Sequence, residues 1–503
     1  MQTVTAPFDT KMSLNTRPKL TAEVEFQQLT VGAAEDAEFT ATGENVISDL
    51  DQLSNGVNSL TNYATLESGR WPLDGSTLIL PDVTTGQIGA WSDELSATDK
   101  TFTTPLILTV SFSSVIDSVG LTIYFDTAQG GYPPAFTINV YNGVTLSETI
   151  NATATSSTWV YETPVNDYDK LEIEISEWSE AEQRARIAQV YFGLVQIFGD
   201  EETVEFSVFR QIDPVNASNP ASELRFAFDN RDGKYDFENP SGIYDYVTLR
   251  QETFARLGFA GELIPLGVYY VTKWETNQST GKATFQALDA LSLLDVTFTD
   301  ETYTSQTLTT IATAALTQAG IASYSLDSSL GDITVTATLE GKTCREVLVN
   351  IAIATCLTLY VDTDGVLTIG ALPTVAEDYT ITYANSQKPV GSLADPLKSI
   401  SVTYDTDTAV TASYEDYGQE INISNNPFIQ TEARANAVLA WLAAYYQRRK
   451  NYRNDWRQNP KIECGDIIGI TTDYGTPTAT VTSQQYTYSA GGLTGQTNSK
   501  GVT

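Results

Sequence analysis

The stretch Leu171-Glu-Ile-Glu-Ile175 alternates apolar and acidic residues along the chain. Successive side chains of a β-strand point to opposite faces, so this pattern places the apolar set in a core and the acidic set in water. The same alternation recurs in 121–125, 136–140 and 333–339. Turn signals such as Asn142-Gly143 stand between these runs. The sequence therefore predicts a mainly β chain with antiparallel sheets.

Helical periodicity is confined to three segments, 305–319, 343–355 and 431–447. Thr343 and Glu346 form a capping-box pair at the start of the second segment. The first two segments flank a predicted strand and precede a predicted hairpin. We therefore expect a small α+β part within an otherwise β chain.

The composition excludes several classes of function. A length of 503 residues suits about three or four domains, and 41% hydrophobic residues are enough for several packed cores. The 28 Lys and Arg stand against 63 Asp and Glu, which gives a net charge of −35. A nucleic-acid-binding protein needs a cationic surface, so specific nucleic-acid binding is disfavoured. No run approaches 18 consecutive apolar residues, so no membrane span is predicted.

The reactive side chains are few. The chain has no histidine, which excludes Ser-His-Asp catalysis and histidine-ligated zinc. Cys344, Cys356 and Cys464 cannot build a disulfide framework, and we expect them to be small core residues. A pair of carboxylates could still act as general acid and base in a glycan hydrolase. The chain has 63 acidic residues, however, and the sequence does not indicate which two would form the pair. We predict no catalytic residue, metal ligand or cofactor, and a glycan hydrolase stays open as an alternative.

Two acidic segments invite a calcium-binding interpretation. In Phe228-Asp-Asn-Arg-Asp-Gly-Lys-Tyr-Asp236, counting back from Gly233 puts Phe228 where an EF-hand needs its first carboxylate. Asp362-Thr-Asp-Gly365 fails in the same way, with Tyr360 at that position. Asp and Asn bond their own backbone in turns, so we expect turns at both places.

One short segment reverses the charge of the chain. It carries six cations in 14 residues: Arg448, Arg449, Lys450, Arg453, Arg457 and Lys461. Such a cluster suits either a nucleic-acid patch or a contact with the acidic surface of a neighbouring copy. Because the remainder of the chain is so acidic, we favour the subunit contact.

Residues 40–199 hold aromatic side chains suited to stacking on sugars. The candidates for glycan contact are Trp71, Trp91, Tyr132 and Trp159. The alternative for each of them is a place in the core of the predicted sandwich.

A set of segments from about residue 205 onward is similar to a known family. In chain order they are Leu224-Arg-Phe-Ala-Phe-Asp-Asn-Arg-Asp-Gly-Lys-Tyr-Asp-Phe-Glu-Asn-Pro240, 266–274 with 283–294, 359–369, Asn426-Pro-Phe-Ile429, 460–468 and Gly491-Gly-Leu-Thr-Gly495. This ordered set resembles the tail-hub (baseplate hub, tail-tip) proteins of bacteriophages. Two further segments, 63–75 and 184–193, resemble a galactose-binding-like jelly roll, a module that phage tail proteins often carry.

The resemblance implies two hub-type β-barrels, an α+β domain and an inserted β-sandwich of the jelly-roll kind. We expect the first hub barrel in 1–39 and 200–299, split by the inserted sandwich in 40–199. The α+β domain is expected in 300–399, and the second hub barrel with one helix in 400–503.

The resemblance also implies a function. It predicts a non-enzymatic virion protein, a homotrimeric hub whose ring caps the tail tube and lets DNA pass. Expected partners are other tail proteins, namely a distal tail protein, a tape measure and a fibre or spike. The resemblance also implies a place at the tail tip of the virion. The start of the chain lacks the features of a secretory signal, which fits the expected assembly in the host cytoplasm.

The inserted module would contact host glycan or other tail proteins, and would then take part in host attachment. The alternative of a different class is a carbohydrate-binding adhesin or lectin, in which residues 40–199 bind glycan and the remainder is a stalk.

Overall fold

The structure is a computed structural model. It describes all residues except 15, 31, 56–62, 66, 69–70, 72–73, 75, 77–78, 81–88, 127–129, 200–202, 240–248, 260, 300–301, 375, 377–378, 406–407, 490 and 503. Strands dominate the described residues, so the predicted mainly β class is confirmed. Two compact units divide the chain. The larger unit is Met1–Glu25, Ile197–Gly242 and Glu252–Thr503, and the smaller unit is Phe26–Gln196 and Ile243–Gln251.

The smaller unit contains two main sheets. The five-stranded sheet has the order β2 (Glu38–Thr42), β6 (Thr101–Ser118), β11 (Val165–Glu177), β8 (Phe136–Asn142) and β9 (Thr145–Ala152). The three-stranded sheet has the order β10 (Thr158–Tyr161), β7 (Leu121–Tyr124) and β13 (Gln189–Tyr191). Short pairs are β3 (Tyr63–Ala64) with β4 (Ile79–Leu80) and β5 (Ala90–Trp91) with β12 (Arg186–Ile187), and α2 (Ala33–Asp36) and α3 (Gln52–Asn55) are single turns.

Period-2 alternation builds the core of the smaller unit. Ile173 of β11 lies opposite Leu108 of β6 and Ile138 of β8, and all three side chains are buried. Their neighbours Glu172 and Glu174 lie on the other face of the sheet. The acidic residues of the alternating stretch therefore stay in contact with water while the apolar ones pack, as the pattern predicts.

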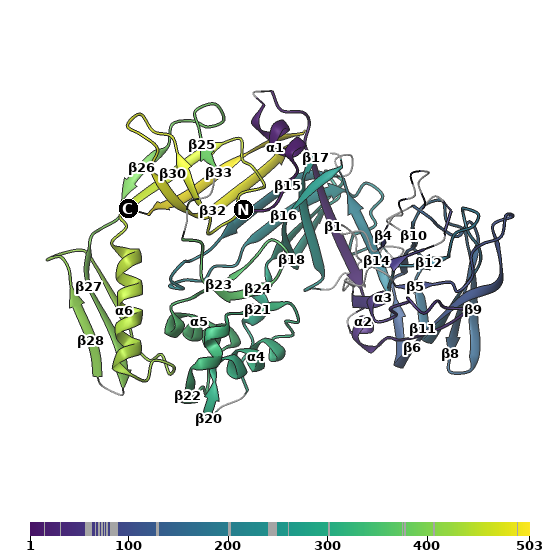
Figure 1. Ribbon diagram of the computed structural model, residues 1–503, viewed down its shortest axis with the longest axis horizontal. Coiled ribbons are helices and arrows are strands. Elements are labelled where there is room, and N and C mark those ends of the chain that lie inside the picture. The colour runs from purple at the N-terminus through teal and green to yellow at the C-terminus, as the bar shows by residue number, and fades with distance from the viewer. Residues whose placement is uncertain are drawn as a thin grey trace. The chain divides into compact units, whose positions relative to one another are not determined.

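The larger unit is built on one continuous sheet (Figure 1). Nine of its strands follow in the order β17 (Glu252–Phe259), β18 (Glu262–Asn277), β19 (Lys282–Leu288), β16 (Glu223–Asp229), β15 (Thr203–Gln211), β32 (Thr478–Ser489), β33 (Gly492–Gly501), β30 (Lys450–Trp456) and β26 (Val390–Leu393). β31 (Ile467–Ile470) pairs with β32 and with β25 (Thr380–Ile381). The pairing of β15 with β32, for example Phe206 opposite Tyr488, joins a strand from the middle of the chain to one near its C-terminal end. The unit boundaries fall inside β1 (Thr21–Leu29) and β14 (Gly193–Phe198).

Three helices of the larger unit match the predicted helical segments. They are α4 (Leu308–Gln318), α5 (Cys344–Thr355) and α6 (Glu432–Tyr446). Thr343 caps α5, and its capping box with Glu346 is present. The first helix begins later than the predicted 305, because β20 (Thr302–Thr307) occupies the preceding residues and Thr307 is the cap of α4.

The three helices share a single apolar core, to which Leu316, Ile351 and Val438 contribute one residue from each helix. Small sheets complete this part: β20 with β22 (Thr334–Thr338); β21 (Tyr324–Leu326), β24 (Leu367–Gly370) and β23 (Thr358–Val361); and β28 (Thr408–Ser413), β27 (Leu397–Asp405) and β29 (Gln419–Ile423). α6 packs on β27 and β28 (Figure 1). The expected domain boundary at 400 lies inside β27, and α6 shares its core with helices on the other side of that boundary.

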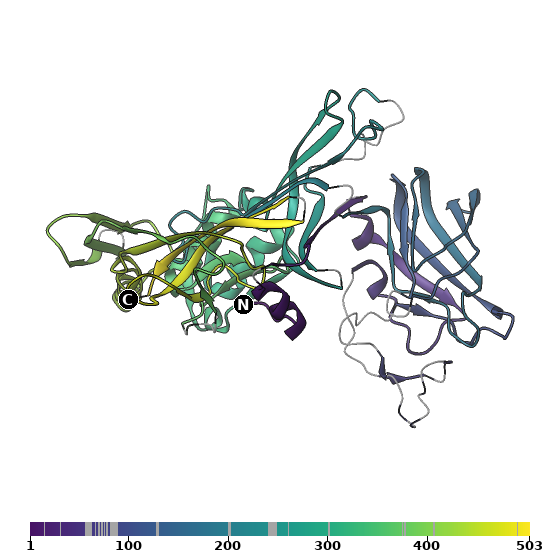
Figure 2. The same cartoon turned by 90° about the horizontal axis from the view of Figure 1, so that it is seen from above.

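The N-terminal segment and the cysteines have defined places in the larger unit. α1 (Ala6–Ser13) is the purple helix beside the N mark in Figure 2. Cys344 is fully buried, whereas Cys356 and Cys464 are half-buried, and all three are free thiols. Across the part of the chain that the structure describes, no helix is both long and apolar enough to cross a membrane.

Candidate subunit-contact cluster, aromatic surface and cavity

The six cations of the basic cluster lie along β30 and the turns beside it. Arg448 and Arg449 follow α6, Lys450 and Arg453 are part of β30, and the remaining two follow that strand. Arg449, Lys450 and Arg453 are exposed, whereas Arg448, Arg457 and Lys461 are half-buried. The structure therefore places all six on or next to one strand but gives them different surroundings.

Two members of the cluster hold the N-terminal segment of their own chain. Nη1 of Arg457 donates to the carbonyl oxygen of Leu14 at 3.2 Å, and Nζ of Lys461 donates to Asp9 at 2.9 Å. In the opposite direction, Nη1 of Arg17 in the N-terminal segment donates to the carbonyl oxygen of Arg457 at 2.6 Å. Burial and the charge of Arg457 lower the pKa of Arg17 to about 10. Arg457 and Lys461 therefore act within the protomer.

The cations near the end of α6 also have contacts within the unit. Nε of Arg449 donates to the carbonyl oxygen of Ala394 at 3.0 Å. Lys500 of β33 places its Nζ 4.4 Å from the ring centre of Tyr445, and burial together with the charge of Arg448 lowers the pKa of Lys500. These contacts attach the end of α6 to the last strands of the chain.

Lys450 and Arg453 are exposed beside β26, and Nη2 of Arg453 lies 3.7 Å from a carboxylate oxygen of Asp455 on the same strand. Val390 of β26 lies opposite Arg453, and Leu393 lies opposite Lys450. Val390 is 51% exposed and Leu393 is 69% exposed, and β26 is the last strand of the sheet in the described part of the chain. Residues three apart on a strand point to opposite faces of the sheet, so the pair Val390 and Arg453 lies on one face and the pair Leu393 and Lys450 on the other. We call these four residues of the outermost strand pair the β26 edge. Its apolar half escaped the sequence analysis, although the exposed Pro389-Val-Gly391 stretch offered a weak edge-strand signal.

The four aromatic candidates divide into exposed and buried side chains. Trp71 is 47% exposed, and its Nε1 donates to the carbonyl oxygen of Thr65 at 2.7 Å. Tyr132 is half-buried. Trp91 and Trp159 are only 3% and 9% exposed, and a buried ring offers no open face to a sugar. The structure thus leaves Trp71 and Tyr132 as side chains that could contact a glycan.

Trp91 belongs to a buried ionic network that the sequence analysis missed. Arg186 donates from Nη1 to Asp126 at 2.5 Å and from Nη2 to Glu67, and its guanidinium lies 3.8 Å from the ring centre of Trp91. Glu67 also accepts a bond from the backbone N–H of Arg184 at 2.9 Å. Burying both carboxylates with one guanidinium is tolerated because the hydrogen bonds compensate the lost hydration. The network holds Glu67, which precedes Trp71 by four positions in the sequence.

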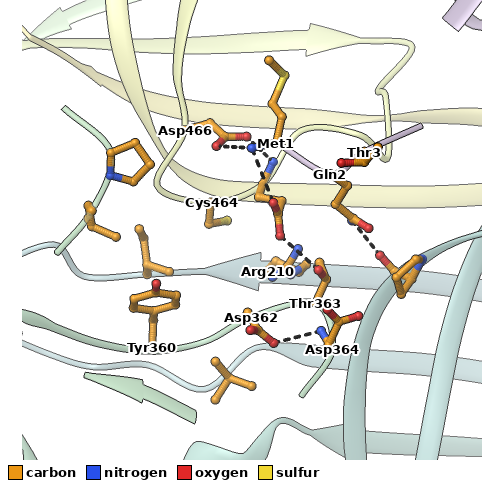
Figure 3. Close-up of a pocket in the computed structure, with 16 residues that line it drawn as sticks. Met1, Gln2, Thr3, Arg210, Tyr360, Asp362, Thr363, Asp364, Cys464 and Asp466 are labelled. Carbon is orange, nitrogen blue, oxygen red and sulfur yellow. Dashed lines mark hydrogen bonds and ion pairs between the residues drawn. The ribbon is translucent and has the colours of Figure 1, made fainter. Parts of the chain in front are cut away.

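The larger unit also contains a pocket of about 530 Å³ that is open to solvent (Figure 3). Its charged lining residues are Met1, Arg210, Asp362, Asp364, Glu463 and Asp466. The amino group of Met1 lies 2.8 Å from Asp466, and burial raises the pKa values of Asp362 and Asp466. The two acidic segments that invite a calcium interpretation form turns, as Asn230 accepts from the backbone N–H of Tyr235 and Asp362 from that of Asp364. In the described residues no group of three or more carboxylates or thiols is arranged to hold a metal ion.

No protein-family model matches the chain, and no curated protein matches it. Solved structures of phage tail proteins are similar to it at low identity. The 43 kDa tail protein of prophage MuSo2 from Shewanella oneidensis is 15% identical, with 60% of this chain and 94% of that chain covered and a TM-score of 0.44. A tail protein from Neisseria meningitidis is 10% identical, with 61% and 93% covered and a TM-score of 0.46. A chitosan-binding module from Paenibacillus sp. is 12% identical, with 33% and 97% covered and a TM-score of 0.20.

The similarity to phage tail proteins that the sequence motifs indicate is thus also found among solved structures.

Proposed function

We propose that this chain is a structural protein of a phage tail, a hub at the tail tip that works as a homotrimeric ring. The ring would cap the tail tube, let DNA pass and hold the neighbouring tail proteins. The ordered hub-like motifs and the mainly β fold support this role. The chain also has no histidine, which fits a role without catalysis. We assign no catalytic step and no cofactor to the chain.

The observation that carries the proposal is the β26 edge. Lys450 and Arg453 expose positive charge beside the exposed apolar side chains of Val390 and Leu393, in a chain of net charge −35. Subunit interfaces combine an apolar centre with a polar rim, and charge complementarity selects the partner. A second copy offers an acidic surface, so head-to-tail contact through this edge can close a ring.

The net charge also suits the passage of DNA. Double-stranded DNA is a dense polyanion, and like charge around it suppresses phosphate contacts. A ring of three such chains would guide DNA without retaining it.

Mass and images of the purified chain test the ring. We expect a particle of about 165 kDa, three times the chain mass of 54.8 kDa. Two-dimensional class averages by electron microscopy should show threefold symmetry. A chain that stays monomeric at high concentration, with no threefold arrangement within a virion either, would contradict the proposal.

We further propose that residues 40–199 form an inserted module that contacts host glycan. Trp71 supports it, because its ring is 47% exposed and is held by the bond from Nε1 to the carbonyl oxygen of Thr65. On a glycan array, Trp71→Ala should lose the binding that the unaltered chain shows. Tyr474→Ala is the control, since Tyr474 is a fully exposed aromatic residue of the larger unit. An array without signal for the unaltered chain would reject glycan binding and leave the ring untouched.

We also propose bounds for the other domains of the chain. The first hub barrel is proposed in 1–39 and 200–299, the α+β domain in 300–399 and the second hub barrel in 400–503. Limited proteolysis with mass spectrometry tests them, because cleavage in folded chains concentrates at exposed linkers between domains.

A further inference from the structure

A row of polar side chains crosses four neighbouring strands of the larger unit. Arg210 of β15 lies opposite Gln484 of β32. Thr497 of β33 lies opposite both Gln484 and Asn454 of β30. Directly opposite residues of an antiparallel pair point to the same face of the sheet, so the four share one face. None of them is more than 5% exposed. We call this set the polar row.

Most hydrogen-bonding atoms of the polar row lack a partner. Thr497 accepts a bond from Nε1 of Trp456 at 2.9 Å. Among the residues that the structure describes, none bonds the side-chain amide atoms of Gln484 or Asn454, or Nη1 of Arg210. A buried amide or guanidinium without a partner costs the hydration that it lost on folding. Native proteins leave few such groups, so several in one row indicate a further molecule that satisfies them.

The chemistry of the row selects the kind of molecule. A carboxamide both donates and accepts, whereas Arg210 only donates. An anion would accept from Arg210 but could not donate to the amide oxygens. A cation would lie against the guanidinium. Water donates and accepts, carries no charge, and makes about three bonds when buried, so it satisfies every member of the row.

The cavity of Figure 3 brings water to the Arg210 end of the row. Arg210 lies at the centre of the labelled residues in that view and lines the cavity. Cross-strand neighbours continue from Arg210 to Gln484, Thr497 and Asn454. We propose that ordered water molecules occupy the polar row and complete the hydrogen bonds of Arg210, Gln484 and Asn454. This water site is independent of the function proposed above.

The first test is an experimental density map around the polar row. A crystal or electron-microscopy map of the full chain at about 2 Å should show water peaks at hydrogen-bond distance from Gln484, Asn454 and Nη1 of Arg210. A row without water, a direct bond between the two amides, or density for a larger ligand would overturn the proposal.

The second test is the thermal stability of Gln484→Leu. In a hydrated row the leucine removes a partner from bound water, so the midpoint of thermal unfolding should fall by about 3 °C or more. In a dry row the substitution removes two unsatisfied atoms, and the midpoint should rise.

Gln458→Leu is the matched control. Gln458 is also buried, but its Nε2 donates to the carbonyl oxygens of Gln485 and Gln496 at 2.8 Å each. Its replacement should lower the midpoint in either case. A midpoint for Gln484→Leu that is unchanged or raised while Gln458→Leu lowers it would refute the hydrated row.

Discussion

Asp289 is a carboxylate that folding buries at the end of β19. Backbone N–H groups of Ser222 and Leu291 donate to it at 2.7 and 3.1 Å, yet burial raises its pKa from 3.8 to about 6. Desolvation disfavours the charged form more than these bonds favour it. The folded chain therefore binds a proton at pH values where the unfolded chain has lost it.

This shift predicts how stability depends on pH. Between about pH 4 and pH 6 the folded state holds more protons, so the contribution of Asp289 to stability falls as pH rises, by about 3 kcal/mol at most. Urea unfolding of Asp289→Asn should show a flatter pH dependence in this window than the unaltered chain. Parallel curves for the two chains would show that Asp289 does not titrate there.

Arg186 is the cation that pairs with two buried carboxylates in the smaller unit, so the stability of this unit should depend on it. Its replacement in Arg186→Met leaves Glu67 and Asp126 buried without their guanidinium partner. Breaking a buried ion pair in this way costs about 3–5 kcal/mol. Calorimetry should show a lower unfolding temperature for the variant.

Arg225→Met is the control for that measurement. Arg225 forms an ion pair with Glu223 at the surface, and its side chain is 63% exposed. Exposed pairs contribute little, so the control should stay near the unaltered chain. An equally small effect of Arg186→Met would mean that the network does not hold the smaller unit.

The sequence indicated the residue types at the candidate sites but not their burial. Trp71 and Trp91 look alike in the chain, yet Trp71 is exposed whereas Trp91 is buried against Arg186. In the same way Lys450 and Lys461 belong to one cluster, yet Lys461 meets Asp9 more than 400 positions away. Contacts between distant segments decide these outcomes, and no local pattern records them.

At the scale of elements, α5 provides a direct test of local sequence rules. Thr343 accepts from the backbone N–H of Glu346, and Glu346 accepts from that of Thr343 at 2.8 Å. Thr343→Ala should lower the free energy of unfolding by about 1 kcal/mol, because an N–H at the helix start loses its acceptor. Denaturant titration measures this change.

Glu346→Gln is the comparison, since glutamine also closes a capping box. It should cost less than Thr343→Ala. The reverse order would assign the effect to the charge of Glu346 at the start of the helix rather than to the bonds.

The helices and many strands follow from local pattern, whereas the joining of the sheet does not. Capping residues and periodicity predicted α4, α5 and α6 to within a few residues. The pairing of β15 with β32 links segments nearly 300 residues apart, and period-2 alternation says nothing about partners at that separation. For the same reason, the local pattern did not predict that α6 shares one core with α4 and α5.

For the whole molecule, the β26 edge predicts that reversing its two charges weakens trimer formation. Lys450→Glu with Arg453→Glu should reduce the particle from about 165 kDa toward the single chain of 54.8 kDa. The unfolding temperature of the protomer should change little, because both side chains are exposed. Light scattering and calorimetry measure the two quantities.

A matched reversal at a distant surface controls for net charge. Lys273 on β18 and Arg231 after β16 are also exposed, so Lys273→Glu with Arg231→Glu changes the net charge by the same amount without touching the β26 edge. It should leave the particle mass unchanged. Trimers that survive the double reversal would place the subunit contact elsewhere.

The three thiols described above have a practical consequence for labelling. Burial raises the pKa of Cys356 to about 11 and keeps that of Cys464 far above neutrality, and Cys344 is fully buried. Thiolates react with maleimides and thiols hardly do, so the native chain should remain unmodified at neutral pH. A cysteine introduced at an exposed position would then be the one reactive handle, and a fluorophore there could report where each protomer sits in an assembled particle.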